Sequence, residues 1–471
     1  MTTKSTIEIN QKLLFEKKVS MHELVDAHLN TIKNYDGVLN SFITVNNEDS
    51  LKEADIIDRL ISKNDKVSLL SKRPLLGTII SYKDMFLTKG IRTTAASKVL
   101  HDYVPQYSAT VVEKLENAGC INIGKTNCDA WAHGSSGENS DYGATKNPWG
   151  IEYVPGGSSS GSAVSVSANM CTVSLGTDTC GSIRLPANFT YTYGLKPTYG
   201  AVSRYGVVAM ASSLDCVGHF SKSAADIKKI FNITKGKDLK DATLDEKFKH
   251  KKRTGIVIGV PDEFFQNGLS KENSLNINKA ISIFEKNGIK FKKINLPHTK
   301  YGISVYYIIQ PAEVSSNLSR YDGIRYGKGR DAFSEEAKRR IMLGTYVLSS
   351  GYYDAYYLKA MKVRSVIIEE IDQAFKSCDA IIAPVSTTPP FKLGEKISDP
   401  LKMYLTDIYA ATANLTGIPS IAVPYGFTND GLPLGFQIMG PRFSENLLFD
   451  LAEKFEEYSN YKIINPNILN R

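Results

Sequence analysis

Near its N-terminus the 471-residue chain has apolar residues at intervals of three and four, the spacing of one face of an amphipathic helix. They include Leu24, Val25, Leu29 and Ile32. Ser20 and Glu23 precede this run at the spacing of a capping box, which favours a helix start there. A further helix is predicted over residues 108–117. We therefore expect a helical N-terminal region over about residues 1–60.

Short runs of apolar and β-branched residues, typical of buried strands, recur through the rest of the chain. They are residues 76–81, 120–124, 172–175, 255–260, 380–383, 420–423 and 434–439. Helical stretches separate these runs. The pattern predicts an α/β fold with a large mixed or mainly parallel β-sheet covered on both faces by helices.

No segment has the composition of a domain linker, so we expect a single domain over residues 1–471. Residues 235–252 are charged, poor in large apolar residues and without periodicity, which indicates a surface connection. Hydrophobic residues make up 42% and charged residues 23% of the chain, close to the globular average. Such a chain can bury a sizeable core.

The net charge of +8 suits a polyanionic partner without establishing one. The densest basic cluster, residues 247–253, is interpreted as a solvated loop, because no aromatic residues form a stacking platform beside it.

The six cysteines are scattered and include no CxxC pair, so we expect neither a disulfide framework nor a zinc or redox site, and a reducing intracellular compartment. No apolar run reaches the roughly 18 to 20 residues of a membrane span, and the N-terminus lacks a signal-peptide profile. Six histidines show no ligand spacing, so no metal is expected: His22, His28, His101, His219, His250 and His298.

Residues 156–184 hold the most distinctive chemistry: a GGSSSGS loop, an apolar run and then DTCGSIR. Ser158 and Ser182 have no acidic residue or histidine beside them, so serine chemistry needs an unusual base, and Lys83 is a candidate. A phosphate-binding loop is the competing interpretation. It is disfavoured because GxxxxGK[ST] is absent and no lysine follows the loop.

These segments resemble the amidase-signature family. The resemblance extends to residues 127–140 (NCDAWAHGSSGENS), 194–200 (GLKPTYG), 203–206 (SRYG) and 211–215 (ASSLD), and we place the family's core over residues 77–220. The separations of Lys83 from Ser158 and of Ser158 from Ser182 match the family without insertions. The resemblance implies the family's α/β fold from about residue 24 to the last helical stretch.

The resemblance also implies a catalytic triad: Ser182 as nucleophile, Ser158 as proton relay preceded by a cis peptide bond, and Lys83 as base. A lysine serves as base only when neutral, and burial without a carboxylate partner lowers its pKa from about 10.4 toward neutrality. If Lys83 ends a strand, Asp84 points to the opposite face. We therefore expect no salt bridge between these neighbours.

By the same resemblance, backbone N–H groups of Thr179, Cys180, Gly181 and Ser182 form the oxyanion hole. Cys180 stands where the family usually has glycine, so we expect its side chain to narrow the pocket or to resist a positive φ. Cys180 is also a rival nucleophile, disfavoured because no histidine is identifiable as its base. Asp178 and Arg184 are expected to pair and brace the turn.

Residues 313–326, 338–345 and 349–357 are similar to one branch of the family, the A subunits of glutamyl-tRNA(Gln) amidotransferases. That similarity implies Arg340 at the α-carboxylate of glutamine and Asp407 at its α-ammonium, a pairing of complementary charges. Tyr306 is expected to add a hydrogen bond, with Tyr307 as an open alternative.

Two residues depart from this branch. Ala130 occupies a position that is usually acidic, and His133 one that is usually methionine. We interpret His133 as a packing or capping residue, because the triad chemistry requires no histidine. The ammonia passage is expected to be lined differently here.

The branch resemblance implies hydrolysis of glutamine to glutamate and ammonia, with ammonia passed to a B subunit that converts Glu-tRNA(Gln) to Gln-tRNA(Gln). A small third subunit is expected, ATP and Mg²⁺ in the B partner, no cofactor in this chain, and tRNA contacts mainly through the partner. The alternatives are a stand-alone amidase acting on another small amide and a catalytically silent scaffold. Altered motif positions and shortened loops favour the mitochondrial matrix over the bacterial cytoplasm.

Overall fold

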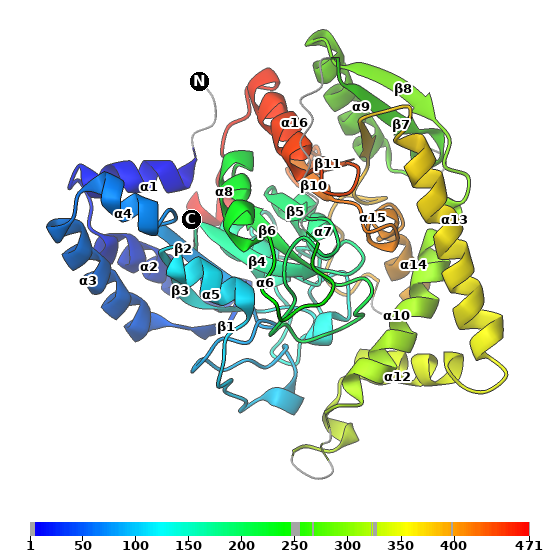
Figure 1. Cartoon of the computed structure of the whole chain (residues 1–471), viewed down its shortest axis with the longest axis horizontal. Helices are drawn as coiled ribbons and strands as arrows, with labels where there is room; N and C mark the ends of the chain where they lie inside the picture. Colours follow the sequence, from blue (N-terminus) through cyan, green and yellow to red (C-terminus); the bar gives the residue numbers. More distant parts are fainter. Residues whose placement is uncertain are drawn as a thin grey trace.

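The computed structural model describes residues 5–245, 255–265, 268–321, 323, 327–396 and 399–470. Within these residues eleven strands form one sheet (Figure 1). Their spatial order is β1 (Phe42–Val45), β3 (Cys120–Thr126), β2 (Thr78–Lys83), β4 (Val173–Asp178), β6 (Cys216–Ser221), β5 (Tyr193–Lys196), β10 (Ser420–Phe427), β11 (Pro433–Met439), β9 (Ala380–Ala383), β7 (Val257–Pro261) and β8 (Lys290–Ile294). The basic cluster at 247–253 and the second half of the 235–252 connection lie outside the described residues.

The sheet is mixed, and this confirms the mixed alternative of the fold prediction. Strand β2 runs parallel to β3 and β4, and β7 runs parallel to β8 and β9. The other neighbours are antiparallel. All seven strands expected from the apolar runs are present; β9 has the predicted ends, and the other six differ at one end or both. Strands β1, β5, β6 and β8 were not predicted.

The N-terminal region is helical as expected, with α1 (Thr6–Phe15), α2 (Met21–Leu39), α3 (Asn47–Lys63) and α4 (Lys66–Lys72). The capping box at the start of α2 is present: Glu23 N donates to Ser20 Oγ at 3.0 Å, and Ser20 N donates to Glu23 Oε2 at 2.7 Å. The apolar stripe of α2 is buried against α3 and the sheet. The helix predicted at 108–117 is α5 (Thr110–Asn117).

Helices cover both faces of the sheet. One face packs against α5, α8 (Ala224–Thr234), α9 (Lys271–Lys286) and α16 (Glu445–Tyr458), which share the largest hydrophobic core. The other face packs against α2, α6 (Ser160–Ser167) and α7 (Arg184–Thr190). Alternating side chains of β2 separate the two cores: Ile80 and Tyr82 lie in the first, and Ile79 in the second.

A further group of helices is seen in green, yellow and orange at the right of Figure 1. It contains α10 (Gly302–Leu318), α12 (Glu335–Val347), α13 (Lys359–Ala374), α14 (Pro400–Leu405) and α15 (Ala411–Leu415). Helix α10 packs on α12, α13 and α15. Of the residues predicted to recognise an amino acid, Tyr306 lies on α10 and Arg340 on α12, while Asp407 lies between α14 and α15.

All six cysteines are buried free thiols. Over the described ranges, no helix combines the length and the hydrophobicity that crossing a membrane requires.

Candidate active site

The residues of the predicted triad meet where the parallel strands β2 and β4 end. Lys83 is the last residue of β2, and Ser158 lies in the loop before α6, which packs on β2 and β4. Ser182 lies in the turn between β4 and α7. Since β2 and β4 run in the same direction, their C-terminal ends lie at one edge of the sheet. Residues distant in sequence therefore converge there.

The Lys83 amine contacts three hydroxyl groups. Lys83 Nζ lies 2.7 Å from Ser158 Oγ, 2.8 Å from Thr177 Oγ1 and 3.2 Å from Ser159 Oγ. Ser159 donates its own proton to the carbonyl of Thr177 at 3.0 Å, so it accepts from Lys83. A neutral amine has two hydrogens and one lone pair. If these hydrogens go to Ser159 and Thr177, the lone pair faces the Ser158 hydroxyl.

Burial lowers the pKa of Lys83, which lies in a fully buried position without a carboxylate in contact. Its neighbour Asp84 instead pairs with Lys125, whose Nζ lies 3.2 Å from Asp84 Oδ1. Asp84 also accepts from the backbone N–H of Thr94 at 2.8 Å. The expectation that Asp84 turns away from Lys83 is confirmed, so no contact with this carboxylate opposes the lowering of the Lys83 pKa by burial.

The serine loop is held by the segment 129–137. Gly157 N donates to Ser135 O at 2.8 Å, and Asp129 N donates to Ser158 O at 3.1 Å. The peptide bond between Gly157 and Ser158 is cis, as the family resemblance implied. A Cβ atom at Gly157 would lie 2.1 Å from Asp129 Oδ2, so only glycine fits there.

The turn carrying Ser182 has one left-handed residue, Gly181, at φ +106°. A Cβ on Gly181 would also lie 2.7 Å from the Cβ of Ala410. The Gly181 N–H donates to Asp178 Oδ1 at 2.7 Å and is therefore committed. The N–H groups of Thr179, Cys180 and Ser182 have no acceptor among the described residues. For those three groups the role in an oxyanion hole stays a prediction. The Gly181 N–H is disfavoured for this role because it already donates to Asp178.

The expectation that Cys180 resists a positive φ was wrong, because the turn does not require a positive φ at this position. The left-handed residue is its neighbour, which is already glycine. The Cys180 side chain is buried with Tyr306, Ile309 and Leu214. Burial, followed by the charge of Asp407, raises the pKa of the Cys180 thiol well above its ordinary value. A protonated thiol is a poor nucleophile, which disfavours the cysteine alternative.

Asp178 and Arg184 form the expected pair, with Nε to Oδ2 at 3.1 Å and Nη2 to Oδ1 at 3.2 Å. Both side chains are fully buried. Burial alone would raise the pKa of Asp178, but the charge and hydrogen bonds of Arg184 lower it to about 2. The pair fixes the turn, because Asp178 also accepts from Ile183 N at 3.2 Å.

Asp407 lies beside this turn. Its Oδ1 is 3.9 Å from the position that a Cβ on Gly181 would take. Ser135 donates its hydroxyl to Asp407 Oδ2. Burial raises the pKa of Asp407 to about 7, against the lowering effects of the Ser135 hydrogen bond and of the Arg340 charge. Asp407 is thus poised to ionise near neutrality.

Arg340 is buried on the inner face of α12. Its Nε donates to Glu336 Oε1 at 2.8 Å and its Nη1 to Gln310 Oε1 at 2.7 Å. Its guanidinium carbon lies 5.4 Å from the ring centre of Tyr307, within the range of a cation–π contact. Arg340 pairs with Glu336 and not with Asp407. A charged group for each end of an amino acid is therefore present without mutual neutralisation.

Both candidate tyrosines are near the site. Tyr306 is buried in the same cluster as Cys180, while Tyr307 stacks on Tyr404 with ring centres 3.7 Å apart. Sequence reasoning missed Thr177, Ser135, Gln310 and Glu336 as functional neighbours. Gln310 and Glu336 each lie four residues before or after a predicted residue, the spacing of one helix face, which is the signal that could have found them.

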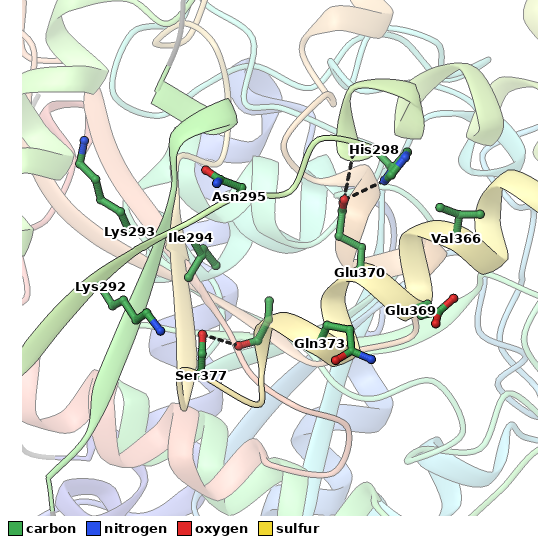
Figure 2. Close-up of a pocket in the computed structure, with 11 residues that line it drawn as sticks. Lys292, Lys293, Ile294, Asn295, His298, Val366, Glu369, Glu370, Gln373 and Ser377 are labelled. Atoms are coloured by element: carbon green, nitrogen blue, oxygen red, sulfur yellow. Dashed lines mark hydrogen bonds and ion pairs between the residues drawn. The ribbon is translucent and has the colours of Figure 1, made fainter.

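One cleft lies away from these residues. It has a volume of about 600 Å³ and separates β8 from α13. In Figure 2 Glu370 of α13 points toward His298, and its Oε1 lies 2.8 Å from His298 Nδ1. No proposed triad or substrate residue lines it. In the part of the chain that the structure describes, no group of three or more histidine, cysteine or acidic side chains could hold a metal ion.

Comparison with known proteins extends this geometry. Residues 23–449 match the family model described as Amidase. The chain is 46% identical to the A subunit of the glutamyl-tRNA(Gln) amidotransferase of Carboxydothermus hydrogenoformans over 98% of this chain and 99% of that protein. It is 44% identical to the corresponding protein of Persephonella marina, over 97% and 98%.

A solved structure agrees with these relatives. The crystal structure of the A subunit of the glutamyl-tRNA(Gln) amidotransferase from Thermotoga maritima superimposes with a TM-score of 0.83 and 40% identity, over 98% of this chain and 96% of that one. The family model and both relatives span nearly the whole sequence. The chain therefore belongs to the amidase family.

Proposed function

We propose that this chain is the glutaminase component, the A subunit, of a glutamyl-tRNA(Gln) amidotransferase. The observation that carries the proposal is the Lys83 amine. It is buried, bonded to hydroxyl groups only, and 2.7 Å from Ser158. Arg340 and Asp407 are buried, Asp407 beside the Ser182 turn, with charges that complement an amino acid. Near full-length similarity to curated A subunits supports the same function.

In the proposed reaction, Ser182 Oγ attacks the carboxamide carbon of glutamine. Its proton passes to Ser158 Oγ while the Ser158 proton passes to the lone pair of neutral Lys83. The C=O double bond becomes an oxyanion, which the N–H groups of Thr179, Cys180 and Ser182 stabilise. Lysine ends this step protonated, and its third hydrogen now donates to Ser158.

Collapse of the tetrahedral intermediate breaks the C–N bond. The leaving amine takes the stored proton back through Ser158 and departs as ammonia, leaving a glutamyl ester on Ser182. A water molecule then attacks the ester carbon, again giving its proton through Ser158 to Lys83. Glutamate leaves as Ser182 regains its proton. Lysine is neutral at the start of each cycle.

Recognition of glutamine is assigned to Arg340 for the α-carboxylate, Asp407 for the α-ammonium and Tyr306 for a further hydrogen bond. The ammonia is used by a partner B subunit, which binds ATP and Mg²⁺ and carries most contacts to tRNA. A small third subunit completes a heterotrimer. No cofactor is assigned to this chain.

For the location of the protein, the mitochondrial matrix remains the proposal. It is drawn from the motif positions at which this chain differs from its family branch. The relatives named above come from bacteria and do not support that preference over a bacterial cytoplasm.

The test uses the full chain with the partner chains that co-purify with it. Ser182→Ala is expected to lower glutamine-dependent formation of Gln-tRNA(Gln) by at least about 10⁴-fold, because the nucleophile is lost. Amidation with added ammonium salt should continue at a rate close to wild type. Equal losses with both nitrogen donors would contradict the assigned role of Ser182.

The two alternatives give different results in the same assay. A stand-alone amidase would hydrolyse other small amides better than glutamine and would gain nothing from partner chains. A silent scaffold would give no covalent adduct at Ser182 with an acylating amide analogue. The scaffold is disfavoured because Lys83, Ser158 and Ser182 are all retained. Lys83 contacts Ser158, and Ser182 contacts the serine loop through its backbone.

A further inference from the structure

Two fully or almost fully buried side chains near Arg340 carry nitrogen atoms without a hydrogen-bond partner among the described residues. Gln310 is 0% exposed and its Nε2 is unpartnered. His133 is 1% exposed and both of its ring nitrogens are unpartnered. Unpaired buried polar groups are rare because each forfeits its hydrogen bonds to water. These nitrogens are therefore free to bond to a ligand.

The orientation of Gln310 follows from its neighbour. A guanidinium group only donates hydrogen bonds, so the atom of Gln310 that receives Arg340 Nη1 at 2.7 Å is the carbonyl oxygen. The amide nitrogen therefore points elsewhere and remains a donor. Arg340 Nη2 likewise makes no hydrogen bond with the described residues. Two donors on one pair of side chains thus lack acceptors.

The segment before His133 packs against the helices that carry this pair. Residues 130–132 share a hydrophobic cluster with Val314 of α10 and Ala337 of α12. Gln310 lies four residues before Val314, and Arg340 lies three residues after Ala337. Each pair is therefore on one face of its helix. Trp131 and Ala132 adopt left-handed φ angles of 58° and 63°, which non-glycine residues rarely do.

The segment after His133 reaches the other charged group of the pocket, because Ser135 donates its hydroxyl to Asp407. His133 thus lies between residues packed beside Arg340 and a residue bonded to Asp407. Burial, followed by the positive charge of Arg340, lowers the pKa of His133 well below its ordinary value. A neutral imidazole offers one N–H donor and one acceptor.

We propose that His133 and Gln310 join Arg340 in binding the α-carboxylate of the amino acid substrate, an inference that rests on the proposed glutaminase function. The unpartnered groups of Gln310 and Arg340 can only donate, so they suit a carboxylate and cannot receive ammonia or an ammonium group through N–H donation. A carboxylate accepts several hydrogen bonds from such donors. Asp407, which only accepts when ionised, takes the α-ammonium.

The test compares glutamine with 4-aminobutanamide, which is glutamine without its α-carboxylate. The variants are His133→Met, Gln310→Met and Arg340→Met, in the full chain with its co-purified partners. Each should raise the KM for glutamine by roughly 10-fold or more, as expected for losing a hydrogen bond to a charged group. The kcat should change less, because the reacting carboxamide is not touched.

For 4-aminobutanamide the same variants should keep kcat/KM within about 3-fold of wild type, since the lost group has no partner in that substrate. His133→Asn retains an N–H donor and should recover part of the affinity for glutamine lost in His133→Met. The matched controls are His22→Met on α2 and Gln373→Met on α13, which replace the same residue types outside the site and should discriminate between the two substrates as wild type does.

The outcomes separate the inference from the function on which it rests. If His133→Met and Gln310→Met impair both substrates equally, their role is structural and the inference is wrong. Unchanged KM for glutamine in both variants would also overturn it while leaving glutaminase function intact. Failure of the wild-type complex to hydrolyse glutamine at all would instead overturn the proposed function.

Discussion

The proposed catalytic centre and the proposed substrate pocket are adjacent but satisfy their polar groups in different ways. Lys83 has three hydroxyl partners, and Asp178 is bonded by Arg184 and two backbone N–H groups. In the pocket, Gln310 and His133 retain buried nitrogens without partners. These side chains of the first region have their partners before substrate arrives, while backbone N–H groups of the Ser182 turn lack an acceptor among the described residues. The second leaves donors for the substrate to engage, which is how a site gains selectivity for a polar ligand.

Burial acts on both regions, with opposite consequences for function. It lowers the pKa of Lys83 and raises the pKa of Asp407 to about 7, so both groups are moved toward their neutral forms. Neutrality makes a lysine a base, but it deprives an aspartate of the charge that holds an ammonium group. The same physical cause therefore supports the first role and makes the second sensitive to pH.

The largest loss of glutaminase activity is expected from substitutions of Lys83, whose amine must be neutral to act as base. Lys83→Arg should lower the glutaminase kcat by at least about 100-fold and nearly as much as Lys83→Ala, because a guanidinium group does not deprotonate at working pH. Steady-state glutamine hydrolysis by the two variants measures this. Melting curves should accompany the rates, since both substitutions disturb a buried site.

An arginine variant with substantial turnover would mean that Lys83 is not the base. The three hydroxyl contacts of Lys83 would then serve only to stabilise the fold. The contrast with the proposed substrate pocket would no longer concern catalysis.

The contact of Lys83 with the serine loop and the closeness of that loop to Ser182 could be predicted from the sequence, because these residues lie in short motifs at fixed separations. Seven strands were likewise visible as apolar runs. Strand β8 was missed because it is an edge strand with the sequence KFKKI, where lysines replace the expected apolar positions. Strands β5 and β6 contain glycine together with lysine or histidine, which hides their complete burial.

The substrate pocket was predicted only in part, for a physical reason. Arg340 and Asp407 are recognisable by charge, but Gln310 matters because helices α10 and α12 pack together and bring it to Arg340. Ser135 reaches Asp407 across 272 positions of sequence. No local pattern encodes such contacts. The error about Cys180 arose similarly, since the sequence does not tell which residue of the turn takes the positive φ.

The pH dependence of substrate preference tests the second half of the comparison. Asp407 holds the α-ammonium only when ionised, and its ionised fraction rises with pH through about 7. The kcat/KM for glutamine should therefore fall as pH drops below 7. Glutaric acid monoamide lacks the α-amino group. Its hydrolysis should depend on the ionisation of Lys83, as that of glutamine does, but not on the ionisation of Asp407. The ratio of the two kcat/KM values isolates Asp407.

Asp407→Asn should remove the pH dependence of that ratio and raise the KM for glutamine by roughly 10- to 150-fold, the effect of losing a charge-assisted contact. A ratio that stays flat with pH in the wild type would place the ammonium site elsewhere.

The smallest effect on catalysis is expected at Cys180, which lies at the boundary between the two regions. Its side chain packs with Tyr306 and Ile309 of the pocket, while its backbone N–H belongs to the oxyanion turn. Cys180→Gly removes the packing and keeps the N–H. The turn already obtains its positive φ at Gly181, so glycine at 180 relieves no strain there.

For Cys180→Gly we expect kcat within about 3-fold of wild type and a free energy of unfolding lower by about 1 to 3 kcal/mol, from the lost side-chain contacts and the added backbone entropy. Cys180→Ala, which keeps a Cβ, should lose less stability at a similar rate. Denaturant melts beside glutaminase assays separate the two effects, and a folded but inactive Cys180→Gly protein together with an active Ser182→Ala protein would assign the nucleophile to the thiol.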